Sequence, residues 1–306
     1  MTDPCKELAT RMSAVQKRRH GVRQTVAEAL DDAVGLVRYA QAPQFAACSA
    51  RLCAYDQLIS VYEMIDRVGY ASEIAKTSST LRDEVTSADT CHACLTSSMV
   101  GALTDQGKLD EAVDLAAKTI EELDLHWLMQ AYYATILIDK QLWIALARRD
   151  GVEAQRLLAR LEGFEQESAI WNAQYDNATV RSVSGNIAEL VREKRVLAAL
   201  AAEDVEEAVA HYAAGLAHDD PSGGRLEVQV ALIQQLTTAQ AKRLAPLVTE
   251  TLEYARLRGY ARASVQIALA TLERDLGPSD QATAVLREMS ASLRSTDLAE
   301  RVQAWI

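Results

Sequence analysis

The sequence predicts an all-α protein, arranged as an α-solenoid of antiparallel helix hairpins. Three observations lead to this fold class. The 306 residues include only 13 Gly and 5 Pro, and these are the residues that most often interrupt helices. Apolar residues recur every three or four positions along most of the chain, which is the helical period. A short phrase also recurs at a nearly constant interval, which is the signature of a repeat array.

The stretch 107–123, GKLDEAVDLAAKTIEEL, shows the helical period most clearly. Its apolar stripe consists of Leu109, Val113, Ala116, Ile120 and Leu123, and most of its acidic residues lie elsewhere on the helix. A helix with one apolar stripe must bury that stripe against another element. Repeated hairpins provide such neighbours, and we expect about fourteen to sixteen helices in all.

The repeat is visible in small residues that follow an acidic residue or a turn in each predicted second helix. The intervals between successive anchors are 37, 42, 54, 37 and 37 residues. Intervals of this size are typical of helix-turn-helix arrays. The anchors are Ala75, Ala112, Ala154, Ala208, Ala245 and Ala282.

Turn signals precede the anchors, as hairpins require. They are Gly69, Gly107, Asp150-Gly151, Glu203-Asp204 and Gly277-Pro278, while Pro43, the segment 220–224 and Arg258-Gly259 separate successive hairpins.

We divide the chain into an N-terminal helical segment (1–45), a first block of repeats (46–162), an irregular joint (163–190) and a second block (191–306). The joint is polar and contains Gly185, so we expect a loop or a short helix there. Two subdomains, or one continuous solenoid with an irregular joint, both agree with this division.

Residues 195–221 resemble the tetratricopeptide repeat. Ala208 stands at its small-residue position, Tyr212 at the aromatic position, Gly215 and Leu216 at the closing pair and Pro221 near the closing proline. Residues 240–277 look like the longer-helix variant of MalT-type bacterial transcription regulators.

The resemblance covers about residues 70–290 and is strongest in those two hairpins; the N-terminal 45 residues lie outside it. It implies a right-handed superhelix whose concave groove holds peptides or partner helices. It does not imply an enzyme.

The formal net charge is −11, which makes nucleic acid an unlikely partner because phosphates repel such a surface. Residues 1–23 are an exception with six Lys and Arg. They form either a basic arm that contacts an acidic partner or a solvated helix face. We find neither a membrane-spanning apolar run nor a secretion signal, so we expect a cytoplasmic protein.

Six of the fourteen Trp and Tyr residues gather between positions 127 and 175. A ligand or peptide site there would contain Tyr132, Asp139, Trp143, Trp171 and Tyr175, because exposed aromatic side chains anchor partners well. The alternative is that these rings pack between helices.

Cys91 and Cys94 have the spacing of metal knuckles and redox pairs. Two functional hypotheses follow: a metal site, to which Cys48 and Cys53 would add two thiolates, and a regulatory disulfide. The third hypothesis is that the thiols are buried and structural.

The spacing of His, Ser and carboxylate residues matches no catalytic motif, so we expect no enzyme and no cofactor. The sequence favours a scaffold or regulatory protein that binds a peptide or partner protein in a groove. Its alternative is a sensory regulator that responds to a small ligand, or to redox change or metal at Cys91 and Cys94. A homo-oligomer agrees with either function.

Overall fold

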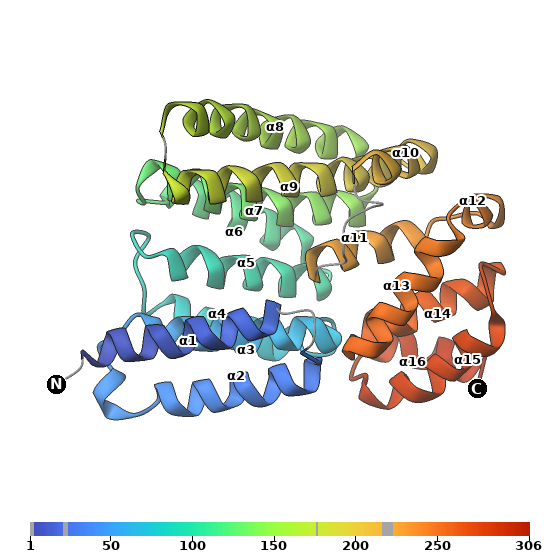
Figure 1. The fold of residues 1–306 in the computed structure, drawn as a ribbon, viewed down its shortest axis with the longest axis horizontal. Helices are drawn as coiled ribbons and strands as arrows, with labels where there is room; N and C mark the ends of the chain where they lie inside the picture. The colour runs from blue at the N-terminus through green and yellow to red at the C-terminus, as the bar shows by residue number, and fades with distance from the viewer. Residues whose placement is uncertain (1–2, 21–23, 176, 216–222) are drawn as a thin grey trace. The chain divides into compact units, whose positions relative to one another are not determined.

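The computed structural model describes residues 3–20, 24–175, 177–215 and 223–306. These residues form sixteen α-helices and two 3₁₀ helices, and no β-strand occurs among them (Figure 1). The all-α prediction and the expected number of helices are therefore confirmed. Within the same residues, no helix is both long enough and apolar enough to cross a membrane.

The helices are short in the N- and C-terminal parts and longest in the middle of the chain. In order they are α1 (Pro4–His20), α2 (Val26–Ala40), η1 (Pro43–Phe45), α3 (Ala50–Asp66), α4 (Ala71–Arg82), α5 (Thr90–Asp105), α6 (Leu109–Glu122), α7 (Trp127–Arg148), α8 (Gly151–Gln174), α9 (Ala178–Ala201), α10 (Val205–Gly215), α11 (Gly223–Ile233), α12 (Thr238–Arg243), α13 (Ala245–Arg258), α14 (Ala261–Arg274), α15 (Ser279–Met289), η2 (Ser290–Ser292) and α16 (Thr296–Gln303).

The chain forms two compact units. Unit 1 combines residues 1–84 with residues 237–306, and unit 2 consists of residues 85–236. The sequence-based blocks and these units divide the chain at different positions.

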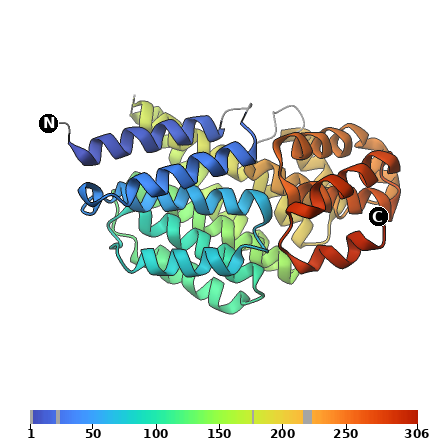
Figure 2. The same cartoon turned by 90° about the horizontal axis from the view of Figure 1, so that it is seen from below.

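Unit 1 brings together helices from both ends of the chain. Helices α2 and α3 pack together, as do α13, α14 and α15, and α14 also contacts α3. Figure 2 shows the orange and red C-terminal helices of this unit as a group beside its blue N-terminal helices.

Unit 2 is built from helices that are neighbours in the sequence. Each of α5 to α9 packs against the next helix, and α5 also contacts α7 while α7 contacts α9. In Figure 1 the helices α5, α7 and α9 of this unit run side by side. One core cluster of the unit joins α7, α8 and α9 through residues such as Leu142, Leu157 and Ile187, which are fully buried.

The predicted turns lie between helices. Gly107 and Gly259 have positive φ angles of 75° and 79°, a backbone conformation that glycine adopts without strain. Asp150 caps α8 by accepting a hydrogen bond from the Glu153 N–H, and Pro43 begins η1.

Four of the six anchor alanines are fully buried, namely Ala112, Ala154, Ala208 and Ala282. Ala75 is half-buried and Ala245 is exposed. At this position Pro246, which has no N–H, stands in the first turn of α13, which begins at Ala245. Ala241 in the preceding short helix is the buried alanine there.

The loop or short helix expected at 163–190 is not found; the region belongs to two long helices. The helix α8 continues to Gln174 and α9 begins at Ala178, so residues 163–174 and 178–190 are helical. The polar side chains of this region pair across the two helices: Arg195 forms ion pairs with Glu162 and Glu165 at 3.0 and 3.5 Å.

The apolar stripe of α9 explains why the segment is helical. Val180, Val183, Ile187 and Val191 are all buried at three- and four-residue spacing, which is the helical period. The frequent Ser, Asn and Gly residues between them obscured that stripe in the sequence.

The basic N-terminal segment folds as α1. Leu8 and Val15 are its buried residues, whereas Lys6, Arg11 and Lys17 are exposed. Among the residues used in the sequence analysis, Arg23, Leu216, Pro221 and the rest of the segment 216–222 lie outside the described residues.

Candidate functional site

A depression in unit 2 lies where three helix ends meet: the start of α7, the end of α8 and the start of α9. Its volume is about 800 Å³. His126 is the residue before α7, Tyr175 follows the last residue of α8, and Asn177 precedes α9. We call this feature the aromatic depression.

Two aromatic rings, those of Trp127 and Tyr175, line the depression. The rings of Trp127 and Trp171 meet edge to face with centroids 4.5 Å apart, and the Tyr175 ring lies 6.0 Å from Trp127. Trp127 is 41% exposed and Tyr175 is 50% exposed. Two large side chains of the lining are therefore exposed at the surface.

The rest of the lining contains both apolar and polar side chains. Leu128 and Val180 are buried residues of the unit 2 core that also line the depression. The polar lining consists of His126, Gln174, Asn177 and Thr179.

The side chain of Asn177 shapes the start of α9. Its Oδ1 accepts a hydrogen bond from the Thr179 N–H at 2.7 Å, and its own N–H donates to the Tyr175 carbonyl at 2.8 Å. Asn is a preferred residue at this capping position because its side chain satisfies an N–H that has no partner within the helix. The cap fixes the polar edge of the depression.

The structure separates the predicted site residues into different places. Tyr175 and Trp127 line the aromatic depression, and Trp171 packs against Trp127. Asp139 and Trp143, further along α7, meet Lys194 of α9 instead. Trp143 stands sixteen positions after Trp127, which is about 24 Å along a helix, too far for one compact pocket.

Tyr132 packs against the core cluster of α7, α8 and α9, and its ring lies 5.3 Å from that of Tyr133. Burial raises the pKa of both tyrosine hydroxyls. These two rings are therefore part of the helix packing.

Around Lys194 is a buried group of charges from α7, α9 and α11, which we call the Lys194 cluster. Its members are Asp139, Glu189, Glu193, Lys194 and Arg225. The Lys194 Nζ lies 2.8 Å from Asp139 Oδ1 and 3.6 Å from Glu193 Oε2. Arg225 Nη2 lies 2.7 Å from Glu189 Oε1.

The Lys194 side chain is only 3% exposed. Burial alone lowers the pKa of an amine, but the carboxylates of Asp139 and Glu193 outweigh burial and raise the pKa of Lys194 above its ordinary value. Burial raises the pKa of Glu193, although Lys194 acts in the opposite direction. The ammonium group is therefore held charged, within 5.6 Å of the Trp143 ring centroid.

Sequence reasoning found Asp139 but missed the residues that surround it. Lys194 and Glu193 stand in REKRVLAAL, where consecutive charges suggest a solvated helix surface. The signal that was available is the nearly unbroken apolar run 196–201 that follows them. That run makes the end of α9 a buried helix, so charges that adjoin it need partners.

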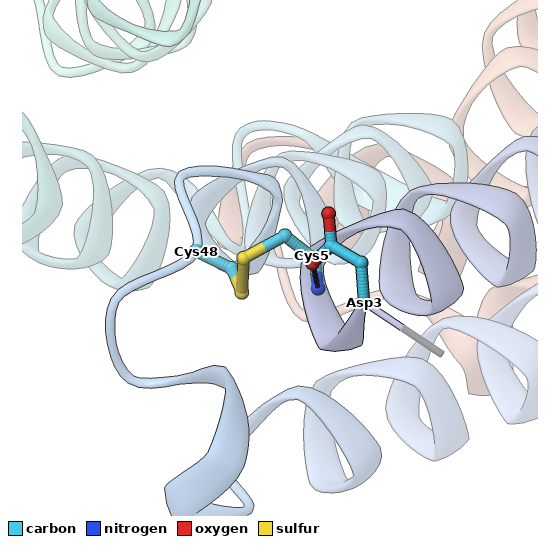
Figure 3. Close-up of a disulfide and its surroundings, with 3 residues drawn as sticks. All are labelled: Asp3, Cys5 and Cys48. Atoms are coloured by element: carbon cyan, nitrogen blue, oxygen red, sulfur yellow. Dashed lines mark hydrogen bonds between the residues drawn. A yellow bond between two sulfur atoms is a disulfide. The ribbon is translucent and has the colours of Figure 1, made fainter. Parts of the chain in front are cut away.

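Cys91 and Cys94 lie on α5, Cys91 buried and Cys94 half-buried, both as thiols. Cys94 faces Tyr133 of α7. The disulfide of the protein joins Cys5 to Cys48 instead (Figure 3). Cys48 is thus committed to Cys5, so the hypothesis that it completes a set of four thiolates with Cys53, Cys91 and Cys94 was wrong.

Over the described residues, no group of three or more His, Cys, Asp or Glu side chains is arranged to hold a metal ion. A metal or redox role for Cys91 and Cys94 stays a prediction. Comparison of the chain with family models, curated proteins and solved structures finds no match.

Proposed function

We propose that the protein is a helical interaction module whose aromatic depression receives a short, uncharged segment of a partner protein. The observation that carries the proposal is the exposure of Trp127 and Tyr175, two large side chains that line one depression. Single exposed apolar residues are ordinary on protein surfaces, but a group beside a concavity is typical of binding sites.

The aromatic rings supply the affinity in this proposal. Trp and Tyr bury a large area and lose little side-chain entropy on binding, which is why they dominate binding hot spots. The edge-to-face contact with the half-buried Trp171 holds the Trp127 ring in place before a partner arrives. A ring that is already ordered loses less entropy on binding.

The polar lining sets the kind of occupant. It contains amides and a hydroxyl, at Gln174, Asn177 and Thr179, and among the described residues of the lining His126 is the sole titratable side chain apart from the Tyr175 phenol. Amides pair with the N–H and C=O groups of a peptide backbone. A highly charged segment would find no carboxylate or ammonium partner among these described residues, and its desolvation would be costly. An extended segment with one large apolar side chain fits this chemistry.

The packing within unit 2 supports a repeat architecture of the tetratricopeptide kind. Contacts between neighbouring helices, together with the contacts of α5 with α7 and α7 with α9, are those of stacked hairpins. We propose that these stacked helix hairpins form a solenoid. We also propose that the protein acts as a scaffold or regulator and not as an enzyme.

The test is selection from a random peptide display library on the immobilised full chain. We expect enriched peptides to share an aromatic or aliphatic residue within an uncharged core. Their affinity, measured by fluorescence anisotropy, should fall at least about tenfold for the double variant Trp127→Ala/Tyr175→Ala, since a hot-spot side chain contributes about 2 kcal/mol or more.

Val152→Ser is the matched control. Val152 is 86% exposed and lies near the opposite end of α8, so its loss removes apolar surface without altering the depression. Affinity should be unchanged in this variant. If the selection enriches no common motif, or if the peptides bind the double variant as tightly as the unaltered protein, the proposal is wrong.

A further inference from the structure

The disulfide of unit 1 joins the first turn of α1 to the segment that follows η1. Cys5 is the second residue of α1, and Cys48 lies three residues beyond the end of η1. Figure 3 shows this link, with Asp3 accepting a hydrogen bond from the Cys5 N–H at 2.9 Å. The disulfide therefore fixes the N-terminal end of α1.

The other attachments of α1 are few. Among the described side chains of α1, Leu8 and Val15 are buried, and Met12 packs half-buried against the same apolar cluster. Arg18 pairs with Asp32 of α2 at 3.0 Å, with its own side chain 59% exposed. Tyr39 of α2 adds a hydrogen bond from its hydroxyl to Glu7 and a cation–π contact with Arg11, whose guanidinium lies 4.1 Å from the ring centroid. These polar contacts are exposed, and exposed pairs contribute little to stability.

Helix α1 has little tendency to stay folded by itself. It is 17 residues long, and most of the stability of a helix in a protein comes from the packing of its apolar face and not from its own propensity. Its C-terminal end is connected to α2 through residues 21–25 of the chain, so the disulfide is the covalent attachment at the opposite end. Without it, α1 is held by the packing of Leu8, Met12 and Val15 and by exposed polar contacts.

We propose that the Cys5–Cys48 disulfide is a thiol-responsive clasp, and that its reduction releases α1 from α2, α3 and η1. The inference is independent of the aromatic depression, which lies in unit 2. It assigns redox sensitivity to Cys5 and Cys48 rather than to Cys91 and Cys94.

The reaction needs a dithiol reductant, such as a small protein with two neighbouring thiols. Its thiolate attacks the Cys5 sulfur, because Cys5 is partly exposed whereas Cys48 is 4% exposed. The bond between the two protein sulfurs breaks, and Cys48 leaves as a thiolate that takes up a proton. The second reductant thiol then displaces Cys5, so the protein gains two electrons and two protons while the reductant becomes a disulfide.

Release of α1 uncovers apolar side chains of α2 and η1. Leu36, Val37, Ala40 and Phe45 belong to the same buried cluster as Leu8 and Val15. This surface is covered in the oxidised protein and exposed in the reduced one.

Limited trypsin digestion of the full chain tests the clasp, with and without tris(2-carboxyethyl)phosphine. Trypsin cuts after Lys and Arg, and α1 offers Lys6, Arg11, Lys17 and Arg18. We expect cleavage within α1 to become at least about tenfold faster after reduction, because proteolysis tracks the population of the open form. Cleavage after Lys118 and Lys140, in unit 2, should be unchanged.

Two variants control for the chemistry. Cys48→Ser should show the fast rate in α1 without reductant and no further change with it. Cys53→Ser removes a thiol of α3 that is outside the disulfide and should respond like the unaltered protein. A cleavage rate in α1 that reduction leaves unchanged would overturn the proposal. Equal acceleration of cleavage in unit 2 would also overturn it, because the disulfide would then stabilise the whole chain. Absence of a peptide linked between Cys5 and Cys48 from a non-reducing digest would overturn it as well.

Discussion

The carboxylate of Asp66 accepts a hydrogen bond from the backbone N–H of Ser295 at 2.7 Å, across 229 positions of the sequence. Asp66 is the last residue of α3, and Ser295 directly precedes α16. The same carboxylate oxygen accepts the Arg294 N–H at 2.8 Å. One side chain therefore connects the end of an N-terminal helix to the start of the last helix, within unit 1.

Replacing Asp66 with Ala should destabilise the protein strongly. Asp66 is 0% exposed and also lies 3.5 Å from the guanidinium of Arg262. Its loss leaves buried N–H groups and a largely buried cation without their acceptor, at a cost of about 3–5 kcal/mol. Urea unfolding followed by circular dichroism measures this free energy.

Asp297→Ala is the control for Asp66. Asp297 binds the same guanidinium at 2.6 Å but its side chain is 47% exposed, so water replaces the lost carboxylate. We expect a loss below about 1 kcal/mol. Equal losses for the two variants would contradict a special role for Asp66.

Gly69→Ala should be destabilising, whereas Gly185→Ala should be mildly stabilising. A Cβ at position 69 would lie 2.7 Å from both the Ser295 nitrogen and the Arg294 Cβ, and it would collide with the Asp66 carboxylate. A Cβ at position 185, on the exposed side of α9, meets nothing within 4 Å. Removing a glycine from a helix interior stabilises by about 0.5–1 kcal/mol.

The two melting temperatures should consequently move in opposite directions, and calorimetry measures both. A fall of similar size in both variants would show that Gly185 is also confined by its neighbours.

The sequence predicted the helices well because their signals are local. Apolar spacing, as in Leu109 to Leu123, and turn residues such as Gly107 act within a few positions. The link between Asp66 and Ser295 leaves no such signal, since neither residue belongs to a pattern that indicates the other. For the same reason the combination of both chain ends in unit 1 was not foreseen.

The candidate site was predictable only in part. The concentration of aromatics indicated Trp171 and Tyr175, but their position at helix ends depends on where α8 stops and α9 starts. The polar composition of residues 163–190 concealed both boundaries. Asp139 shared a helical stripe with Trp143, and the partner that decides its role, Lys194, is 55 residues away.

Replacing Lys194 with Met should destabilise unit 2. The Met side chain fills similar volume but leaves the carboxylates of Asp139 and Glu193 without the ammonium group that neutralises them. Removing one partner of a buried ion pair costs about 3–5 kcal/mol. Urea unfolding at neutral pH measures the loss.

Lys118→Met provides the comparison for Lys194. Lys118 pairs with Glu122 at 3.6 Å on the surface of α6, with a side chain 69% exposed. Its replacement should cost less than about 0.5 kcal/mol. A similarly small effect for Lys194 would mean that the Lys194 cluster rearranges or admits water.

Glu193→Gln should gain stability relative to the unaltered protein as the pH rises. Burial raises the pKa of Glu193 in the folded state above its ordinary value of 4.5. Between 4.5 and the raised pKa, the folded protein holds a proton that the unfolded chain has lost. Stability therefore falls as the pH rises through this interval, because a rising pH favours the state with fewer bound protons, which here is the unfolded state. Glutamine does not titrate, so the variant lacks this loss.

The Glu193 prediction is checked by urea unfolding of both proteins at several pH values from 4.5 to 8. The change to Gln also weakens the attraction of position 193 to Lys194 and Arg225, and that loss can make the variant less stable at the lowest pH. The informative quantity is accordingly the slope of the stability difference and not its sign at one pH. A difference that stays flat, or that moves against the variant as the pH rises, would mean that Glu193 is ionised in the folded state throughout. In that case the positive charges of Lys194 and Arg225 outweigh its burial.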